Sequence, residues 1–205
     1  MGTTDYTDGT DKKLFYQGNP CYPWSKRGNR KVAQWQYWVM QGRLGMPYSL
    51  FHTRFPEVAE SETRTVTVID PSSFNLPPAH YSFLEMFCDE SGCDCRRVFL
   101  SVVSSLQNDI KAVIAWGWED KTFYRKWMGS NDPNMINDLM GPVLNLASPQ
   151  SDLSPALLKL FQRVLLQDSA YIERVKQHYA MFRETVDKRG PKKVTRKKKR
   201  KKKKA

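Results

Sequence analysis

The chain has no apolar run long enough to cross a membrane, and its 205 residues include only four cysteines and three histidines. A membrane helix needs about 20 consecutive apolar residues, so we expect a soluble protein. The first 13 residues contain no apolar core of a signal peptide. We therefore expect a cytoplasmic protein whose cysteines stay reduced, a state that favours metal binding over disulfides.

Sequence motifs of several enzyme classes are also absent. The chain has no His-Glu-x-x-His and no pairing of His-x-Glu with Pro-Cys-x-x-Cys, so zinc proteases and zinc deaminases of those types are excluded. It also has no phosphate-binding loop, nucleophile elbow or Gly-x-Gly-x-x-Gly. The sequence therefore favours a binding protein over an enzyme.

Positive charge is concentrated at the C-terminal end. The chain has 33 Lys and Arg against 21 Asp and Glu, and 13 of the 33 cations lie in residues 188–205, which contain no acid. Subtraction leaves 20 cations and 21 acids in residues 1–187, a net charge of −1. A run of like charges with little to bury predicts a disordered tail on a nearly neutral body.

Such a tail is expected to bind the phosphate backbone of RNA or DNA, with an affinity that falls steeply as salt rises. Alternatives are an anionic membrane surface, a tail that only adds solubility and, in a eukaryote, a nuclear-import signal. The residues predicted to contact nucleic acid are Lys192, Lys193, Arg196, Lys197, Lys198, Lys199, Arg200, Lys201, Lys202, Lys203 and Lys204.

The middle of the chain has the patterns of β-strands. Residues 64–70 alternate valine with polar residues, and residues 81–87, 97–103 and 110–118 are rich in aromatic and β-branched residues. Turn residues separate these runs, which predicts an antiparallel sheet of about four strands over residues 64–118.

Helical patterns follow over residues 121–187. Short helices are predicted at 121–128 and 133–140, and two long helices begin near Ser154 and near Asp168 or Ser169. In the last helix we expect Val175, Tyr179 and Phe182 to face the sheet and Arg183 to face solvent. The predicted fold is α+β, a sheet covered by C-terminal helices.

The N-terminal part has two different compositions. Residues 1–18 are rich in Gly, Thr and Asp and predict a flexible leader. Residues 19–56 are rich in aromatics and include a helix predicted over residues 30–41, which carries Trp35 and Trp38. We therefore predict one folded domain over residues 19–187, between a leader and a tail.

Three cysteines fall within eight residues, around a turn-like Asp-Glu-Ser-Gly between two predicted strands. In a hairpin, Cys93 and Cys95 would point to one face of their strand and Cys88 would approach them across the turn. Three thiolates favour Zn²⁺ over Mg²⁺ or Ca²⁺, whereas free buried thiols are the alternative.

The fourth zinc ligand is open. We prefer Cys21, which would complete a site of four thiolates, whereas a water in the fourth position would make the site potentially catalytic. His80 would lie roughly 26 Å from Cys88 along an extended strand and is disfavoured. The other ligands considered are His52, His178, Asp89 and Asp94.

The run FCDESGCDCRRVFLSV, with IAWGWEDKTFYRKW behind it, resembles a group of poorly characterised bacterial proteins. These carry a Cys-Asp-Cys-Arg-Arg hairpin, and some end in a small cysteine-rich zinc motif of the SEC-C type. The similarity covers residues 81–127 and, more loosely, the helices to Phe182. This chain departs from the SEC-C type, because its C-terminus has lysines and no cysteines. The resemblance implies a bacterial cytosolic metal-binding protein and supplies no activity.

Taken together, these patterns predict a zinc-stabilised module that associates with nucleic acid, with ribosomal RNA as one plausible target. One alternative is a metal-dependent enzyme acting on nucleic acid, with an open metal position and Glu85 or Asp94 as base. The other is an adaptor that docks a protein partner through Trp35 and Trp38.

Overall fold

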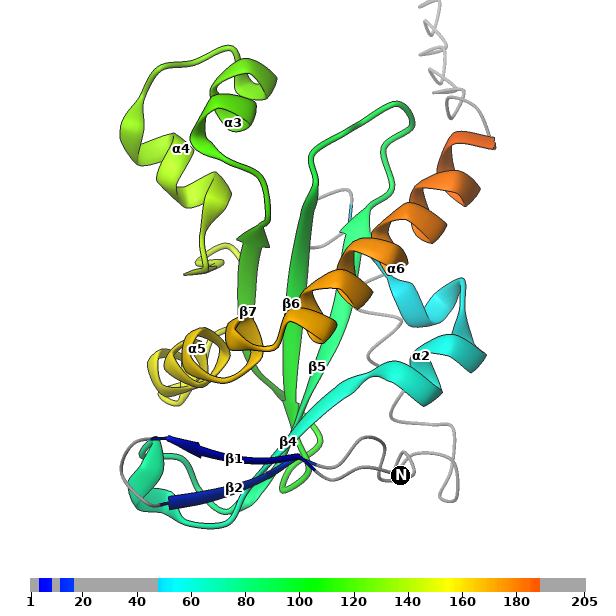
Figure 1. Cartoon of the computed structure of the whole chain (residues 1–205). Helices are drawn as coiled ribbons and strands as arrows, with labels where there is room; N and C mark the ends of the chain where they lie inside the picture. Colours follow the sequence, from blue (N-terminus) through cyan, green and yellow to red (C-terminus); the bar gives the residue numbers. More distant parts are fainter. Residues whose placement is uncertain (1–3, 9–11, 17–47, 189–205) are drawn as a thin grey trace, which may run out of the picture.

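The computed structural model describes residues 4–8, 12–16 and 48–188 (Figure 1). The helix predicted over residues 30–41, Cys21 and residues 189–205 of the tail lie outside the described residues. No helix in the described ranges is long and apolar enough to span a membrane.

An antiparallel sheet forms the centre of the fold. Its strands follow the order β1-β2-β4-β5-β6-β7-β8, and β3 pairs with β5 beyond the end of β4. The strands of the described residues are β1 (Thr4–Asp8), β2 (Lys12–Tyr16), β3 (Tyr48–Leu50), β4 (Arg64–Val68), β5 (Ala79–Cys88), β6 (Arg97–Ser104), β7 (Ile110–Gly117) and β8 (Val143–Leu144).

The α+β class and the antiparallel sheet are confirmed, but the count of about four strands is too low. The four predicted strands are β4 to β7. Residues 48–188 add β3 and β8, which are three and two residues long and too short to show a period in the sequence. Residues 4–8 and 12–16, within the predicted leader, add the antiparallel pair β1 and β2.

Helices α5 (Ser154–Arg163) and α6 (Ser169–Lys188) cross one face of the sheet (Figure 1). Their apolar stripes enclose the main core, together with the short 3-10 helix η3 (Leu165–Gln167). As predicted, Val175, Tyr179 and Phe182 of α6 are buried in this core. A smaller cluster around Met86 and Phe99 lies on the other face of the sheet.

Helices α3 and α4 have the predicted bounds, and side-chain caps explain where they begin. Helix α3 (Lys121–Met128) begins after Asp120, which accepts a hydrogen bond from the amide of Phe123, and ends at Gly129 with φ of 66°. Helix α4 (Pro133–Met140) begins after Asp132, which accepts from the amide of Asn134. In both cases a short acidic side chain satisfies an amide that the first turn leaves unpaired.

The aromatic segment predicted over residues 19–56 is described only from Tyr48 onward. After β3 it forms the 3-10 helix η1 (Phe51–Thr53), followed by helix α2 (Pro56–Glu62). The ring of Phe51 stacks on the imidazole of His178 at 4.3 Å, so this segment packs on α6. A second 3-10 helix, η2 (Pro71–Ser73), follows β4.

Candidate metal centre

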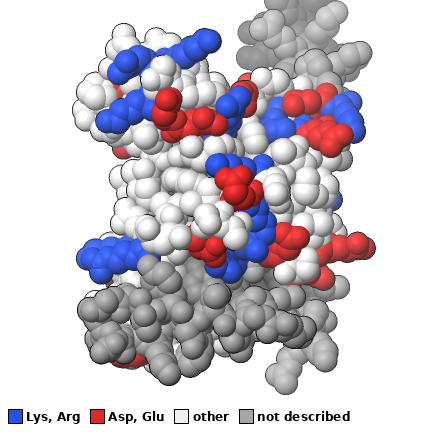
Figure 2. Space-filling view, viewed as in Figure 1, with Lys and Arg blue, Asp and Glu red and all other residues white. Residues whose placement is uncertain are grey.

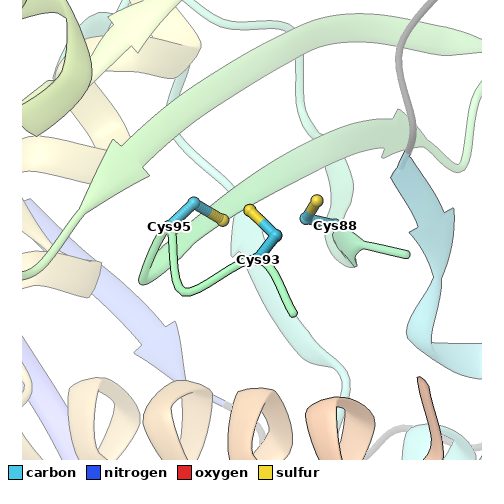
Figure 3. A group of neighbouring side chains, drawn as sticks. All are labelled: Cys88, Cys93 and Cys95. Atoms are coloured by element: carbon cyan, nitrogen blue, oxygen red, sulfur yellow. The ribbon is translucent and has the colours of Figure 1, made fainter. Parts of the chain in front are cut away.

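Residues 88–96, which we call the cysteine loop, connect β5 to β6 and bring three thiols together (Figure 3). The sulfur atoms of Cys88, Cys93 and Cys95 all lie within 4.8 Å of one another. Cys88 and Cys95 are buried and Cys93 is half-buried. The predicted convergence of these cysteines is confirmed, and the group could hold a metal ion.

The loop achieves this convergence differently from our prediction. Residues 93–96 are not part of a strand, since β6 begins at Arg97, so strand alternation does not align Cys93 with Cys95. Instead the chain turns at Gly92, whose φ is 76°, and the amide of Cys93 donates to the oxygen of Glu90 at 3.2 Å. Glycine suits this turn because it adopts positive φ without steric cost.

The three thiols interact strongly with one another. A hydrogen bond to Cys95 is the main cause that raises the pKa of Cys88, and burial raises it further. Cys95 accepts this hydrogen bond, which lowers the pKa of Cys95. Burial raises the pKa of Cys93. Metal binds the thiolate form of cysteine, which the raised pKa values of Cys88 and Cys93 disfavour. A divalent cation at this site would stabilise the thiolates.

Within residues 48–188 no histidine or carboxylate joins the sulfur group. Of the ligands considered, Asp89 accepts a hydrogen bond from Ser49 at 3.1 Å and Asp94 forms an ion pair with Arg96. His52 and His178 also lie outside the group. The prediction of Cys21 as the fourth ligand concerns a residue outside the described ranges and stays a prediction.

The prediction that His80 lies far from the cysteines is confirmed. His80 pairs with Thr67 near the start of β5, and its Nδ1 lies 2.8 Å from the hydroxyl of that threonine. Cys88 is the last residue of the same strand.

Helix α6 fastens the cysteine loop from one side. The guanidinium of Arg183 donates to the main-chain oxygens of Cys88 and Glu90, at 3.0 and 2.9 Å. It also pairs with Asp187, whose carboxylate accepts a hydrogen bond from the amide of Gly92 at 3.0 Å. The expectation that Arg183 faces solvent is therefore wrong, since this residue is 8% exposed and holds the loop.

Two tyrosines fasten the other end of the loop at Arg96. The hydroxyl of Tyr179 on α6 accepts a hydrogen bond from the amide of Arg96 at 3.2 Å, and the hydroxyl of Tyr124 on α3 donates to its carbonyl at 2.8 Å. Burial raises the pKa of both phenols, so they stay protonated at neutral pH. Sequence reasoning missed both contacts, because each joins segments far apart in the chain.

Arg96 itself has an uncommon backbone conformation, with φ of 47°. For a residue with a Cβ this left-handed region costs about 1–2 kcal/mol. Its side chain forms ion pairs with Asp94 and Glu119, both at 3.0 Å, which together with the two tyrosines hold the residue in place. The strained residue directly follows Cys95, and its left-handed conformation turns the chain into β6, which begins at Arg97.

The two carboxylates considered as catalytic bases are hydrogen-bonded to basic side chains of the protein. Glu85 is 7% exposed, and its carboxylate lies 2.8 Å from Nδ1 of His178. Asp94 accepts hydrogen bonds from Arg96 at 3.0 and 3.2 Å. Neither arrangement favours the enzyme alternative.

Comparisons with protein-family models, with curated proteins and with solved structures gave no match for this chain. The resemblance to bacterial proteins with a Cys-Asp-Cys-Arg-Arg hairpin therefore stays an expectation that rests on the quoted residues alone.

Proposed function

We propose that the protein is a zinc-stabilised module that associates with the backbone of nucleic acid, RNA or DNA. The observation that carries the proposal is the group of three sulfurs within 4.8 Å of one another. Zinc binds thiolates at about 2.3 Å in a tetrahedron, so sulfurs around one ion lie roughly 4 Å apart. The spacing in the cysteine loop suits such an ion with little rearrangement.

A structural role suits the site better than a catalytic one. Two of the three cysteines are buried, and the backbone on both sides of them is hydrogen-bonded to α6 and α3. In structural zinc sites the ion closes a loop whose ligands come from a few nearby positions. With Cys21 as the fourth ligand, the ion would also tie the aromatic N-terminal segment to the sheet.

The charge distribution supports the nucleic-acid part of the proposal. Residues 188–205 carry 13 cations and no acid, against a net charge of −1 for the rest of the chain. A dense run of cations condenses on a polyanion and releases counterions, which gives affinity with little dependence on sequence. A neutral body with such an arm suits insertion between RNA helices, as in ribosomal RNA.

Metal analysis tests the first half of this function. We expect about one zinc per chain in protein purified without chelator, as for a closed structural site. Cys93→Ser should reduce the metal content and the melting temperature, whereas Ser91→Ala in the same loop is the matched control. A Cys93→Ser variant with unchanged metal content and melting temperature would rule out the zinc site.

Removing residues 189–205 tests the second half. The full chain should bind unrelated RNA and DNA sequences with similar affinity, and the logarithm of its binding constant should fall linearly with the logarithm of salt concentration. The shortened chain should lose most of this salt-dependent affinity. Equal affinity of the full and shortened chains would place nucleic-acid binding entirely on the body.

A further inference from the structure

Helix α3 carries three cations that form no ion pair within the part of the chain that the structure describes. Lys121, Arg125 and Lys126 are exposed, and the helix itself contains no acid. At 100° per residue they fall within a 140° arc, in which Lys121 lies 60° and Lys126 lies 160° from the buried Tyr124. We call these three residues the basic face of α3. Figure 2 shows Lys and Arg side chains at the end of the molecule where α3 and α4 lie.

The basic face differs from most of the folded body, where cations are paired. Arg64, Lys111 and Arg183, for example, each form an ion pair with an aspartate. No ion pair is formed by any residue of the basic face within the described ranges. Of the two acids that directly precede the helix, Glu119 pairs with Arg96 and Asp120 uses its carboxylate to cap α3.

An exposed aromatic side chain, Trp127, follows Lys126 in the sequence and points 100° from it around the helix. Trp127 is 39% exposed and the neighbouring Met128 is 37% exposed, although both are large apolar residues. Helices α3 and α4 pack on each other through a small cluster of their own, built on Tyr124, Ile136 and Leu139, which leaves Trp127 outside. A tryptophan next to Lys126 can stack on a nucleobase whose neighbouring phosphate binds that lysine.

The cysteine loop contacts both α3 and the C-terminal end of α6, and so fixes the position of one relative to the other. Arg96 lies 4.6 Å above the ring of Phe123 and accepts the hydrogen bond from Tyr124, while Arg183 and Asp187 hold the same loop from α6. Figure 1 shows α3 and the C-terminal end of α6 at one end of the molecule, on either side of the β5–β6 connection.

We propose that the outer face of α3 is a second nucleic-acid contact, which takes a single strand. Its phosphates lie against Lys121, Arg125 and Lys126, and one base extends past Lys126 around the helix to stack on Trp127. The proposal rests on the proposed function and deepens it, because it adds a contact in the folded body to the contact made by the tail. A single strand fits better than a duplex, since only an unpaired base offers its face to an aromatic ring.

The test measures binding of fluorescent poly(U), poly(dT) and duplex RNA to the full chain over a range of salt concentrations. R125Q/K126Q removes one Arg and one Lys from the basic face. K159Q/R163Q removes the same two residue types from the exposed, unpaired positions of α5 and is the matched control. We expect the first variant to lower the salt slope for single strands by about 1.4, at about 0.7 per lost phosphate contact, and the control to leave it unchanged.

Trp127→Ala should weaken binding of single strands about tenfold and change duplex binding little. All variants should keep the metal content of the wild type, since these side chains are exposed and lie outside the sulfur group. Equal slopes for R125Q/K126Q and its control would overturn the α3 contact. Binding to phosphatidylserine vesicles is measured in parallel. If R125Q/K126Q loses binding to the vesicles and keeps binding to nucleic acid, the α3 contact is also overturned, and the partner of this face is a membrane.

The two proposals fail in different ways. If removal of residues 189–205 abolishes binding and the α3 variants behave as wild type, the proposed function stands and the α3 contact is wrong. If the full chain binds none of the three nucleic acids, the proposed function is wrong and the α3 contact fails with it.

Discussion

The guanidinium of Arg183 donates a hydrogen bond to the main-chain oxygen of Cys88 at 3.0 Å, across 95 residues of sequence. A second bond reaches the oxygen of Glu90 at 2.9 Å. Both acceptors lie in the cysteine loop, so one buried side chain of α6 fixes the direction from which the Cys88 sulfur approaches its neighbours. Arg183 is thus a positioning residue for the candidate metal centre.

Replacing Arg183 by Met should destabilise the protein by about 2–4 kcal/mol, because two carbonyl groups lose charge-assisted hydrogen bonds. It should also weaken zinc binding about 10- to 100-fold, the usual effect of losing a group that orients a metal ligand. Denaturant unfolding and competition with a chromophoric chelator measure the two effects.

Lys188→Met is the control, since it removes an ion pair with Glu184 from an exposed site on the same helix. It should change stability and zinc affinity little. An Arg183→Met variant that matches this control in zinc affinity would mean that the loop holds its shape without α6.

The fourth ligand can be identified by a second substitution. If Cys21 completes the site, Cys21→Ser should lower zinc affinity by more than the loss of an orienting partner does, that is, beyond about 100-fold. His80→Ala is the control and should leave affinity unchanged, because His80 lies near the opposite end of β5. Wild-type affinity in Cys21→Ser would assign the fourth position to water or another group.

Much of the fold could be predicted because its elements are long enough to show a period. The alternation in β4 and the helix signals at residues 121–128 and 133–140 give the correct bounds or nearly so. The short strands β3 and β8 could not be predicted, since two or three residues show no alternation. They form because neighbouring strands offer unpaired backbone groups.

The site was predictable only in part, for a related reason. Three cysteines within eight residues are visible in any sequence, and their convergence needs just one loop. The role of Arg183 depends on the angle at which α6 crosses the loop, which no local pattern records. The group of Glu62, Glu85 and His178 joins three segments up to 116 residues apart, and tertiary packing alone creates it.

Gly117 gives a test of how α3 and α4 dock on the sheet. A Cβ added at Gly117 would lie 2.1 Å from the hydroxyl of Tyr124 and 2.7 Å from the oxygen of Leu139. Gly117→Ala should therefore push the two helices away from β7 and destabilise the protein by about 1–3 kcal/mol. Thermal unfolding monitors the loss.

A double-mutant cycle separates this clash from the general cost of the substitution. Tyr124→Phe removes the hydroxyl that the new methyl would meet, together with its hydrogen bond to Arg96. The double variant should be more stable than the sum of the single effects predicts, by about 0.5 kcal/mol or more. Additive effects would mean that Tyr124 does not limit the space at Gly117.

His178 should make stability depend on pH. Its Nδ1 lies 2.8 Å from Glu85 of β5 and its Nε2 lies 3.1 Å from Glu62 of α2, and the side chain is nearly inaccessible. Burial alone would lower the pKa of His178. The hydrogen bonds and charges of the two glutamates outweigh it, so the pKa lies above its ordinary value of 6.5.

The direction of the pH effect follows from that raised pKa. The folded protein holds the His178 proton more tightly than the unfolded chain, so the stabilisation is fully present below about pH 6.5. It is lost as the pH rises through the higher pKa of the folded state. The difference in free energy of unfolding between wild type and His178→Gln should therefore shrink as the pH rises above 6.5.

His52 of η1 lines a small pocket together with Glu85 and His178, and its pKa changes in the opposite sense. Burial lowers its pKa, so its contribution is present above about pH 6.5 and declines as the pH falls. Comparing wild type with His178→Gln at each pH cancels the His52 effect, which both proteins share. A constant difference across the range would show that the two glutamates do not hold a proton on His178, and that its role is packing against Phe51.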